Sequence, residues 1–520
     1  MVKPLVAQAE TGEATALHLI SAPELIFDED GVSDALTAAF EGVTDSSEVR
    51  AAAVRILGDA QKAGRAEIAR AFAATPFDAR AMTSAYCFLT DQLVRSTLQI
   101  AVQRLHPKPN PTSGERLAVI GVGGYGRGEM APFSDVDLLF LIPYKATAWT
   151  ESVIESMLYM LWDLKLKVGH STRTIRDCIR LGSEDFTIQT ALLEHRFIAG
   201  NLELAAELDE TLKTDLFSGS GRNFIEAKLE ERALRHRKQG LRYQVEPNVK
   251  EAKGGLRDLQ SLFWIAKRIY GVETAADLVD RGIFLEEEFK TFVAAENFLW
   301  AVRGHLHLLS GRATEQLTFD MQVAVAEAMG YTDTGGRRGV EVFMQAYFRH
   351  ATQVGELTRI FLTKLESIHI KAEPLLERIF RRRPKMRNGY KVVGGRLAIV
   401  DDATFIADKL NLLRIFEEAL RTGMLIHPDA MRLVQRNLNL IDDEMRNDAE
   451  AQRIFLDLML KHGNPERGLR RMNELGVLSA FIPEFENIVA MMQFNMYHSY
   501  TVDEHTIQCI TNLALIEKGE

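Results

Sequence analysis

Hydrophobic side chains in this 520-residue chain recur first at helical spacing and later in short runs, and this change divides the chain into regions. Residues 47–105 carry apolar side chains every three to four positions, which predicts amphipathic helices with a break around Pro76. The closely spaced prolines of 107–111 end this pattern, because proline cannot continue a helix. Residues 1–45 are weakly patterned and predict a loose N-terminal extension.

Short apolar runs then alternate with glycines and with one further helical stretch. Residues 117–122 and 138–142 predict two strands, and 166–174 predicts a third. Residues 151–165 lie between the second and third strands and place their apolar side chains on one side of a helix. Helical periodicity follows from 186 to 365, so the whole order predicts an α+β fold with a large helical part.

The remaining pattern completes a prediction of five parts. Residues 389–404 are strand-like around Gly394 and Gly395, which predicts a hairpin, and helical periodicity resumes from 405. We therefore expect a loose extension, a small mixed sheet with the helices that precede it, a helical domain, a linker module that contains the hairpin, and a last helical segment, with boundaries at 1–45, 46–220, 221–370, 371–480 and 481–520.

Composition and charge narrow the classes of protein that this pattern allows. A hydrophobic content of 46% with 26% charged residues is typical of a soluble globular protein. The net charge of −10 argues against a protein that binds nucleic acid through broad phosphate contact. The three cysteines are far apart and the chain has neither a signal peptide nor a membrane-spanning run, so we expect a cytoplasmic protein with no membrane partner.

The candidate chemistry lies between 121 and 137, where a glycine-rich turn precedes two aspartates. Strand residues alternate between faces, so Asp135 and Asp137 are expected to project the same way while Val136 points into the core. Two carboxylates beside a loop with free backbone N–H groups can hold Mg²⁺ against a polyphosphate. This arrangement predicts a nucleotide site and nucleotidyl transfer.

Three other interpretations of this stretch compete with that one. Residues 121–126 satisfy the Gly-x-Gly-x-x-Gly pattern of dinucleotide-binding folds, but Pro132 and the next strand follow too soon for the long helix that such folds need. The Walker A pattern fails because no Gly-Lys-Ser/Thr follows. The glycines could also serve backbone geometry alone, and the aspartates a solvated turn.

The combination of Gly123-Gly124, ten intervening residues and Asp-Val-Asp resembles the polymerase-β-like nucleotidyltransferase superfamily. The resemblance implies that Gly123, Gly124 and Gly126 approach the nucleotide phosphates and that Asp135 and Asp137 bind catalytic Mg²⁺. Ser134, just ahead of the pair, could cap the turn or contact a phosphate, and Arg127 could balance the phosphate charge. A third carboxylate is expected on the next strand, but 169–174 has none; His170 is near that position or is a surface histidine.

Further stretches resemble the bifunctional PII uridylyltransferase/uridylyl-removing (GlnD) family. They are Gly123–Glu129, Ser134–Asp137, Val168–Ser171, Val245–Lys250, Gly254–Asp258, Leu306–Leu308, Gly311-Arg312 and Tyr500–Thr506. The resemblance implies transfer of UMP from UTP to a tyrosine of the PII signalling protein when glutamine is scarce. It also implies hydrolytic removal of UMP, by an HD-type metal phosphohydrolase domain, when glutamine is plentiful.

The central basic stretch has an interpretation of its own. Lys250 and Arg257 flank Gly254-Gly255 and could neutralise triphosphate charge, although a solvated basic helix face followed by a loop has the same composition. Asp258 receives no assigned role. His305 and His307 are two residues apart in a helical region and so point in different directions, which favours structural roles over a metal site.

The C-terminal end matches only the start of the family's HD domain. His505 corresponds to its first metal ligand, and His498 would share a helix face with it, but the remaining ligands are not found between 505 and 520. We therefore expect a transferase half followed by a truncated HD domain, without uridylyl-removing activity and without the glutamine-sensing domains. The alternatives are a CCA-adding tRNA enzyme, an adenylyltransferase of glutamine synthetase, or a non-catalytic nucleotide sensor.

Overall fold

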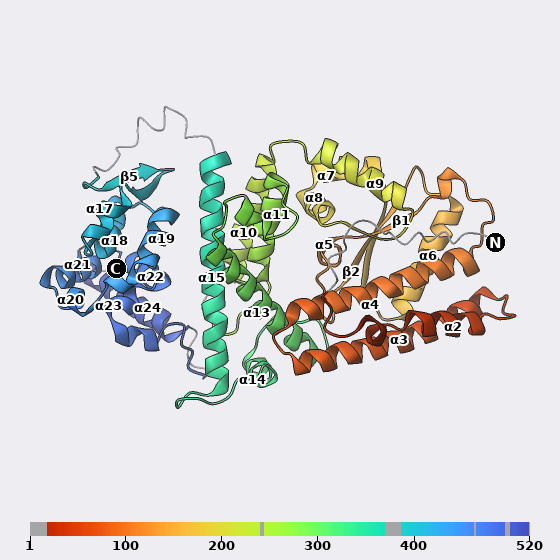
Figure 1. The fold of residues 1–520 in the computed structure, drawn as a ribbon, viewed down its shortest axis with the longest axis horizontal. Coiled ribbons are helices and arrows are strands. Elements are labelled where there is room, and N and C mark those ends of the chain that lie inside the picture. Colours follow the sequence, from red (N-terminus) through yellow and green to blue (C-terminus); the bar gives the residue numbers. More distant parts are fainter. Residues whose placement is uncertain (1–17, 240–243, 370–385, 462–463, 495–499, 519–520) are drawn as a thin grey trace.

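The computed structural model describes residues 18–239, 244–369, 386–461, 464–494 and 500–518. Figure 1 shows an elongated molecule in which the long helix α15 (Gly339–His369) stands between a C-terminal unit and the rest of the chain. Within the described residues, no helix is both long enough and apolar enough to cross a membrane.

The N-terminal segment is more ordered than its weak pattern predicts. The prediction of a loose extension over 1–45 is wrong for the described part of that range, because Ile26, Val32 and Phe40 are buried; residues 1–17 lie outside the described residues. The first four helices pack along one another at the lower right of Figure 1, and their bounds are α1 (Pro23–Ile26), α2 (Glu29–Ala39), α3 (Ser46–Ala74) and α4 (Ala79–Ile100). The predicted helix break around Pro76 is confirmed.

A four-stranded sheet follows, with the order β3-β2-β1-β4. Strand β1 runs antiparallel to both of its neighbours, whereas β2 and β3 are parallel and are connected by the crossover helix α6 (Ala148–Asp163). The three predicted strands and the predicted helix are confirmed, but β4 falls in a range for which only helices were expected. The strand bounds are β1 (Ala118–Gly121), β2 (Val136–Ile142), β3 (Val168–Thr174) and β4 (Arg196–Gly200).

Helices cover both faces of this sheet, and alternate residues of β2 belong to different cores. Val136, Leu138 and Phe140 pack in the core that contains α4 and α6. Leu139 and Leu141 pack on the other face. The helices on that face are α7 (Ile175–Glu184), α8 (Phe186–Leu193) and α9 (Leu202–Thr211). Asp137 therefore lies on the α7–α9 side of the sheet.

The helical region that follows shares a core with the sheet region. One continuous hydrophobic cluster extends from Ile26 to Leu365, and helix α13 packs against both α4 and α15. The predicted parts 46–220 and 221–370 are thus joined by side-chain packing. The helices concerned are α10 (Arg222–Gln239), α11 (Leu256–Tyr270), α12 (Asp277–Asp280), α13 (Glu286–Ser310) and α14 (Phe319–Ala328).

The C-terminal unit has its own core and begins with the predicted hairpin. Strands β5 (Tyr390–Val393) and β6 (Arg396–Ile399) pair antiparallel, which confirms that prediction. Its helices are α17 (Asp402–Ala407), α18 (Asn411–Thr422), α19 (Pro428–Arg436), α20 (Asp443–Arg446), α21 (Ala449–Leu460), α22 (Pro465–Glu474), α23 (Val477–Phe481) and α24 (Val502–Lys518). Arg432 of α19 pairs with Glu288 of α13 at 2.5 and 2.7 Å and connects this unit to the helical region.

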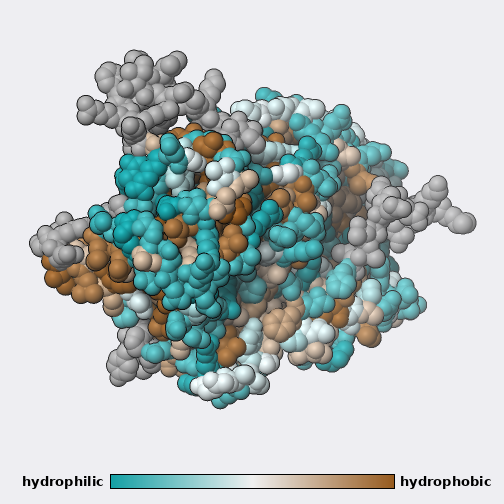
Figure 2. All heavy atoms as spheres, turned by 60° about the vertical axis from the view of Figure 1, so that its left-hand side comes forward, coloured by the Kyte–Doolittle hydropathy of each residue, from teal (hydrophilic) through white to brown (hydrophobic). Residues whose placement is uncertain are grey.

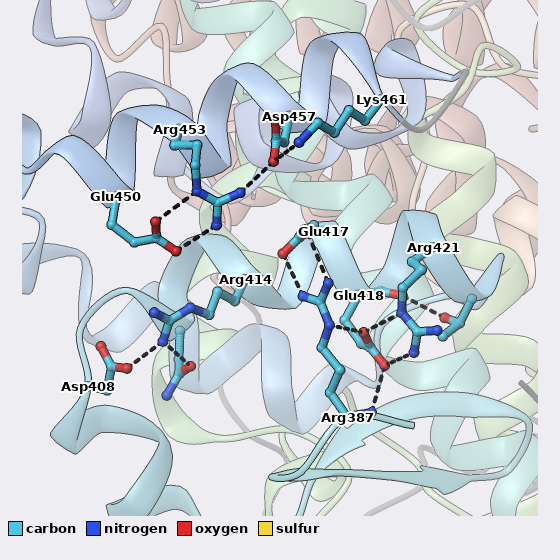
Figure 3. A network of polar contacts seen from close by, with 12 residues as sticks. Arg387, Asp408, Arg414, Glu417, Glu418, Arg421, Glu450, Arg453, Asp457 and Lys461 are labelled. Atoms are coloured by element: carbon cyan, nitrogen blue, oxygen red, sulfur yellow. Dashed lines mark hydrogen bonds and ion pairs between the residues drawn. The ribbon is translucent and has the colours of Figure 1, made fainter. Parts of the chain in front are cut away.

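Ion pairs tie the hairpin to α18 in this unit (Figure 3). Glu418 is fully buried and accepts hydrogen bonds from the Arg387 backbone N–H at 3.1 Å and from the Arg421 guanidinium. Arg387 also pairs with Glu417 at 2.6 Å. The surface of the unit is mostly hydrophilic, with hydrophobic side chains gathered at one edge (Figure 2). The charges of Arg387, Glu417, Glu418 and Arg421 are thus balanced within this cluster.

Candidate active site

The two aspartates stand at the head of β2 as the alternation predicts. Val136 is fully buried, whereas Asp135 is exposed and Asp137 is half-buried on the opposite face. Burial raises the pKa of the Asp137 carboxyl, the nearby Asp135 charge raises it further, and Lys250 opposes both effects. Two carboxylates that repel each other in this way form a site that favours a bound cation.

Glycines on both sides of Asp137 leave space around its carboxylate. Gly123 has φ +61°, and a Cβ there would lie 3.3 Å from Asp137 Oδ2. Gly169 of β3 is paired with Asp137 in the strand register, and a Cβ on it would lie 2.5 Å from Asp137 Oδ1. A side chain at 169 would therefore displace the carboxylate, so the β3 side of the site needs glycine.

The glycine turn is a single helical turn, α5 (Gly123–Gly126). The Gly126 N–H is already donated to the Val122 carbonyl at 3.1 Å. A Cβ on Gly126 would lie 1.8 Å from the Glu194 carbonyl oxygen, so this glycine is required by packing against the start of β4. Of the predicted phosphate-binding glycines, Gly123 and Gly124 are at the start of the turn, where backbone N–H groups have no partner within the turn.

Arg127 lies in a buried ion cluster behind the turn. Its guanidinium donates to Glu129 at 2.8 Å and to Glu194, which also accepts the indole N–H of Trp264 from α11. The side chain is only 12% exposed. The charge of Arg127 is thus engaged by two carboxylates, and Glu194 links the turn to α11 through Trp264.

Tyr125 anchors the same turn from the other side. Its hydroxyl donates to Asp91 of α4 at 2.7 Å, and Arg196 of β4 pairs with the same carboxylate at 2.6 Å while lying over the Tyr125 ring. Sequence reasoning missed this support because it depends on β4. The signal available was the run of charged residues at 194–196 followed by the apolar residues of 197–199.

The loop that delivers Asp135 is held by its own turn and by α13. The Ser134 hydroxyl accepts the Ala131 N–H at 3.0 Å, and the Ser134 N–H donates to the Ala131 carbonyl at 3.0 Å. Buried His307 accepts the Phe133 N–H at 3.4 Å through Nδ1. His305 points elsewhere, stacking on Phe72 at 4.3 Å, so the structural roles predicted for the two histidines are confirmed.

The basic stretch reaches the aspartates through Lys250. Asn248 Oδ1 accepts the backbone N–H groups of Lys250 and Glu251 at 3.1 and 2.7 Å and so fixes the bend that carries the lysine. Burial lowers the pKa of Lys250, and the neighbouring charges of Arg303 and Arg257 lower it further. A partly desolvated lysine that acts on Asp137 is placed to meet an anion at this site.

Arg257 and Asp258 begin α11 and differ in their surroundings. Arg257 contacts Gln260 at 3.0 Å and lies over the Trp264 ring. Asp258 is completely buried and accepts hydrogen bonds from the His236 ring at 2.8 Å and the Gly254 N–H at 2.9 Å. Two arginines of α10, Arg232 and Arg235, pair with it as well. Asp258 is therefore a structural connector between α10 and α11.

His170 does not stand beside the aspartates. It pairs in register with Leu138, which places it on the opposite face of the sheet from Asp137, 6.5 Å from the Phe140 ring and 6.2 Å from the Trp162 ring. The interpretation of His170 as a replacement for a third carboxylate is wrong, and the surface alternative is correct. Among the residues that the structure describes, no three His, Cys, Asp or Glu side chains are grouped for a metal ion.

His505 lies far from this site, on α24 of the C-terminal unit. The side chain is exposed, and its Nε2 is 3.8 Å from the Cys509 Sγ. His498, expected to share its helix face, lies outside the described residues. The metal-binding role of His505 stays a prediction.

Comparisons with protein families identify relatives of three parts of the chain. A family model described as GlnD PII-uridylyltransferase matches residues 223–362, and one described as uridylyltransferase GlnD third domain matches 390–481. A model described as glutamate-ammonia ligase adenylyltransferase matches 5–161, a range that includes the glycine turn and both aspartates.

Curated relatives named bifunctional uridylyltransferase/uridylyl-removing enzyme align along most of the chain. The relative from Ruegeria pomeroyi is 70% identical over 495 residues, which make up 95% of this chain and 54% of the relative. The one from Cereibacter sphaeroides is 64% identical over 480 residues, 92% and 52% respectively. The one from Azospirillum brasilense is 46% identical over 477 residues, 91% and 51%. The chain thus spans about half the length of the curated relatives it matches.

Proposed function

The chain belongs to the family of bifunctional uridylyltransferase/uridylyl-removing enzymes, and from this premise we propose that it transfers UMP from UTP to a tyrosine of a PII signalling protein. Pyrophosphate is the other product. The observation that carries the proposal is the pair Asp135 and Asp137, which share one face at the head of β2 between two glycines. For the full-length members of the family, the resemblance predicts glutamine as the effector.

The donor set fits a divalent cation, and Mg²⁺ is the ion we propose. Asp135 and Asp137 offer only carboxylate oxygens, which are the ligands that Mg²⁺ takes from proteins, and two of them leave room for water and phosphate oxygens. Gly123 and Gly169 keep that room free of side chains. When bound, the metal would neutralise charge on the triphosphate and on the attacking oxygen.

The remaining residues position the nucleotide and balance its charge. Lys250 places an ammonium near Asp137, where it can pair with the triphosphate once the aspartates are occupied by metal. Gly123 and Gly124 allow the backbone to approach phosphate oxygens. Ser134 closes the turn before Asp135, with its hydroxyl hydrogen free to donate to a phosphate. Arg127 supports the turn from behind through its pairs with Glu129 and Glu194, and Arg257, stacked on Trp264, lies on the basic stretch that carries Lys250.

The reaction that this arrangement supports is an in-line displacement at the α-phosphate of UTP. The tyrosine hydroxyl forms a bond to the α-phosphorus, the bond to the bridging oxygen of pyrophosphate breaks, and the phenolic proton leaves to solvent. Catalysis of this kind depends on positioning and charge stabilisation, which the fixed head of β2 and the anchored glycine turn supply.

Intact-mass spectrometry of purified PII protein incubated with this chain, UTP and Mg²⁺ tests the proposal. We expect a mass gain equal to one UMP, no gain with ATP, and no gain with the Asp137→Asn variant. A chain that binds UTP and Mg²⁺ but never modifies PII would instead support a nucleotide sensor.

The adenylyltransferase reading has one observation in its favour, the family match over 5–161. It is tested in the same format with glutamine synthetase as acceptor and ATP as donor, where we expect no AMP gain. The expected lack of uridylyl-removing activity also stays a prediction, and metal-dependent UMP release from modified PII would contradict it.

A further inference from the structure

Strand β3 is an edge of the four-stranded sheet. Among the residues that the structure describes it pairs only with β2, and none of them adds a strand to its outer side. The Val136 N–H donates to the Lys167 carbonyl, so the parallel ladder turns the N–H and C=O groups of 169, 171 and 173 toward β2. The N–H groups of Val168, His170 and Thr172 therefore point outward, and none of them has a hydrogen-bond partner in the described part of the chain. His170 and Thr172 are also exposed as side chains.

This edge is adjacent to the aspartates. Gly169 of β3 lies opposite Asp137, and it has no side chain to separate the edge from the carboxylate. A strand added to β3 would lie about 10 Å from β2, two strand spacings away. Side chains of such a strand that face the Asp137 side would therefore project over Gly169 toward the site.

The other face of the edge offers a hollow with a volume of about 390 Å³. Its lining combines Thr172 with apolar residues of α6, among them Leu158, Tyr159 and Trp162, and with the acidic residues Glu151 and Glu155. The two aromatic rings meet edge to face at 5.8 Å, and both side chains are more than 40% exposed. Exposed aromatic pairs of this kind are typical of protein-recognition surfaces.

Charge at this edge is mixed and does not by itself select a segment. Lys165 and Lys167 precede β3 and Arg176 follows it, whereas exposed Glu151 and Glu155 line the hollow. The position of the edge is what favours a strand that carries the reacting tyrosine, because Gly169 of β3 lies opposite Asp137. Alternate side chains of an added strand would enter the hollow and face the aspartates in turn.

We propose that an extended segment of the acceptor protein adds as a strand to the open edge of β3 and so presents its tyrosine to Asp135 and Asp137. The residues on either side of the tyrosine would occupy the hollow formed with α6. Backbone hydrogen bonds would supply affinity and the hollow would supply specificity. This inference rests on the proposed function, because it assumes that the acceptor is a polypeptide.

Thr172→Pro tests the strand addition. Proline removes the outward N–H and leaves the bonds to β2 intact, and proline is tolerated on edge strands where the N–H faces solvent. We expect the KM for the acceptor protein to rise at least about 10-fold, with the KM for UTP and the melting temperature unchanged.

Val392→Pro is the matched control. By the same alternation Val392 has an outward N–H on β5, which within the described ranges pairs only with β6 in the C-terminal unit. The Val392→Pro substitution should leave the KM for the acceptor protein unchanged. Trp162→Ala provides a second test that does not alter the backbone, and it should raise the acceptor KM several-fold with kcat preserved.

The outcomes separate this inference from the proposed function. If the wild-type chain transfers no UMP, the proposed function fails. If the wild type transfers UMP and the acceptor KM is unchanged in Thr172→Pro, the docking inference fails alone. If Thr172→Pro does not fold, an unchanged acceptor KM in Trp162→Ala overturns the inference, and a raised one supports it.

Discussion

Asp137 at the head of β2 and Asp258 at the α10–α11 junction both lie near cationic side chains, but their pKa values shift in opposite directions. Asp258 is fully buried; burial opposes its charge, yet hydrogen bonds and ion pairs from His236, Arg232 and Arg235 outweigh it and lower its pKa. Asp137 is half-buried beside another carboxylate, and its pKa is raised by burial and by Asp135. A carboxylate whose charge is satisfied within the chain holds structure, whereas one whose charge lacks compensation is available to a ligand.

The largest expected effect is loss of transfer in Asp137→Asn. Asparagine is nearly isosteric but is a poor metal ligand, so we expect the rate of UMP transfer to fall by at least about 10³-fold, since the metal supplies several kcal/mol of charge stabilisation. The free energy of unfolding should not decrease, because the substitution removes the repulsion from Asp135. Transfer rates by intact mass and denaturant titrations check the two expectations. A variant that retains its rate would remove Asp137 from the site.

Asp258→Asn should show the opposite result. The substitution removes the buried charge that Arg232, Arg235 and His236 share, so we expect the free energy of unfolding to fall by about 3–5 kcal/mol. Transfer by the remaining folded protein should be much less affected than in Asp137→Asn. Urea denaturation measures the loss, with exposed Asp280→Asn as the control. If Asp258→Asn is as stable as wild type, Asp258 is not the structural carboxylate that distinguishes the α10–α11 junction from the head of β2.

Gly169→Ala would sharpen the comparison, because it perturbs Asp137 without touching its charge. The added Cβ would lie 2.5 Å from Asp137 Oδ1 and must displace the carboxylate. We expect roughly a 10²-fold loss in kcat, since small misplacements of catalytic groups have effects of this size. Thermal unfolding should be nearly unchanged because Gly169 is exposed. If steady-state kinetics show that Gly169→Ala retains its full kcat, the close approach of residue 169 to the Asp137 carboxylate is contradicted.

Lys250→Gln should weaken UTP binding without destabilising the fold. Charged hydrogen bonds contribute about 1.5–3 kcal/mol, so we expect kcat/KM for UTP to fall about 10- to 100-fold. The pKa of Lys250 is lowered by burial and by neighbouring arginines, so the neutral variant relieves an unfavourable charge. Kinetics with UTP varied, together with calorimetric titration, checks both statements. Unchanged UTP affinity would place Lys250 outside the nucleotide site.

The smallest effect concerns acid stability at Glu315. Burial alone would raise the pKa of Glu315, but His307 and Arg303 lower it to about 2 from 4.5. A lowered carboxyl pKa stabilises the folded state above the unfolded value, and this stabilisation is lost as pH falls. Between pH 4.5 and 2, wild type should lose stability more steeply than Glu315→Gln. If the unfolding free energies of wild type and Glu315→Gln fall in parallel across this pH range, the lowered pKa of Glu315 is contradicted.

The sequence predicted local features well where periodicity and motif coincide. The strands that contain 118–121 and 136–142, the inward Val136 and the hairpin at 390–399 follow from alternation within a few residues. β4 was missed because a five-residue strand inside helical sequence has too little periodicity to register.

The surroundings of the site residues were less predictable, because they depend on partners distant in sequence. Arg127 pairs with Glu194, which also accepts a hydrogen bond from Trp264 of α11, and His170 lies on the face opposite Asp137 because it is in register with Leu138. The packing of residues 18–45 likewise depends on α3, a contact that hydropathy alone does not reveal.

Mg²⁺-dependent UTP binding tests the central claim most directly. Calorimetric titration of UTP into wild type and Asp137→Asn, each with and without Mg²⁺, isolates the contribution of the paired aspartates to metal-bound nucleotide. We predict that Mg²⁺ tightens UTP binding to wild type and that this gain disappears in Asp137→Asn, while the residual metal-free affinity is similar in both. An equal Mg²⁺-dependent gain in the two proteins would contradict the placement of the metal site at the head of β2.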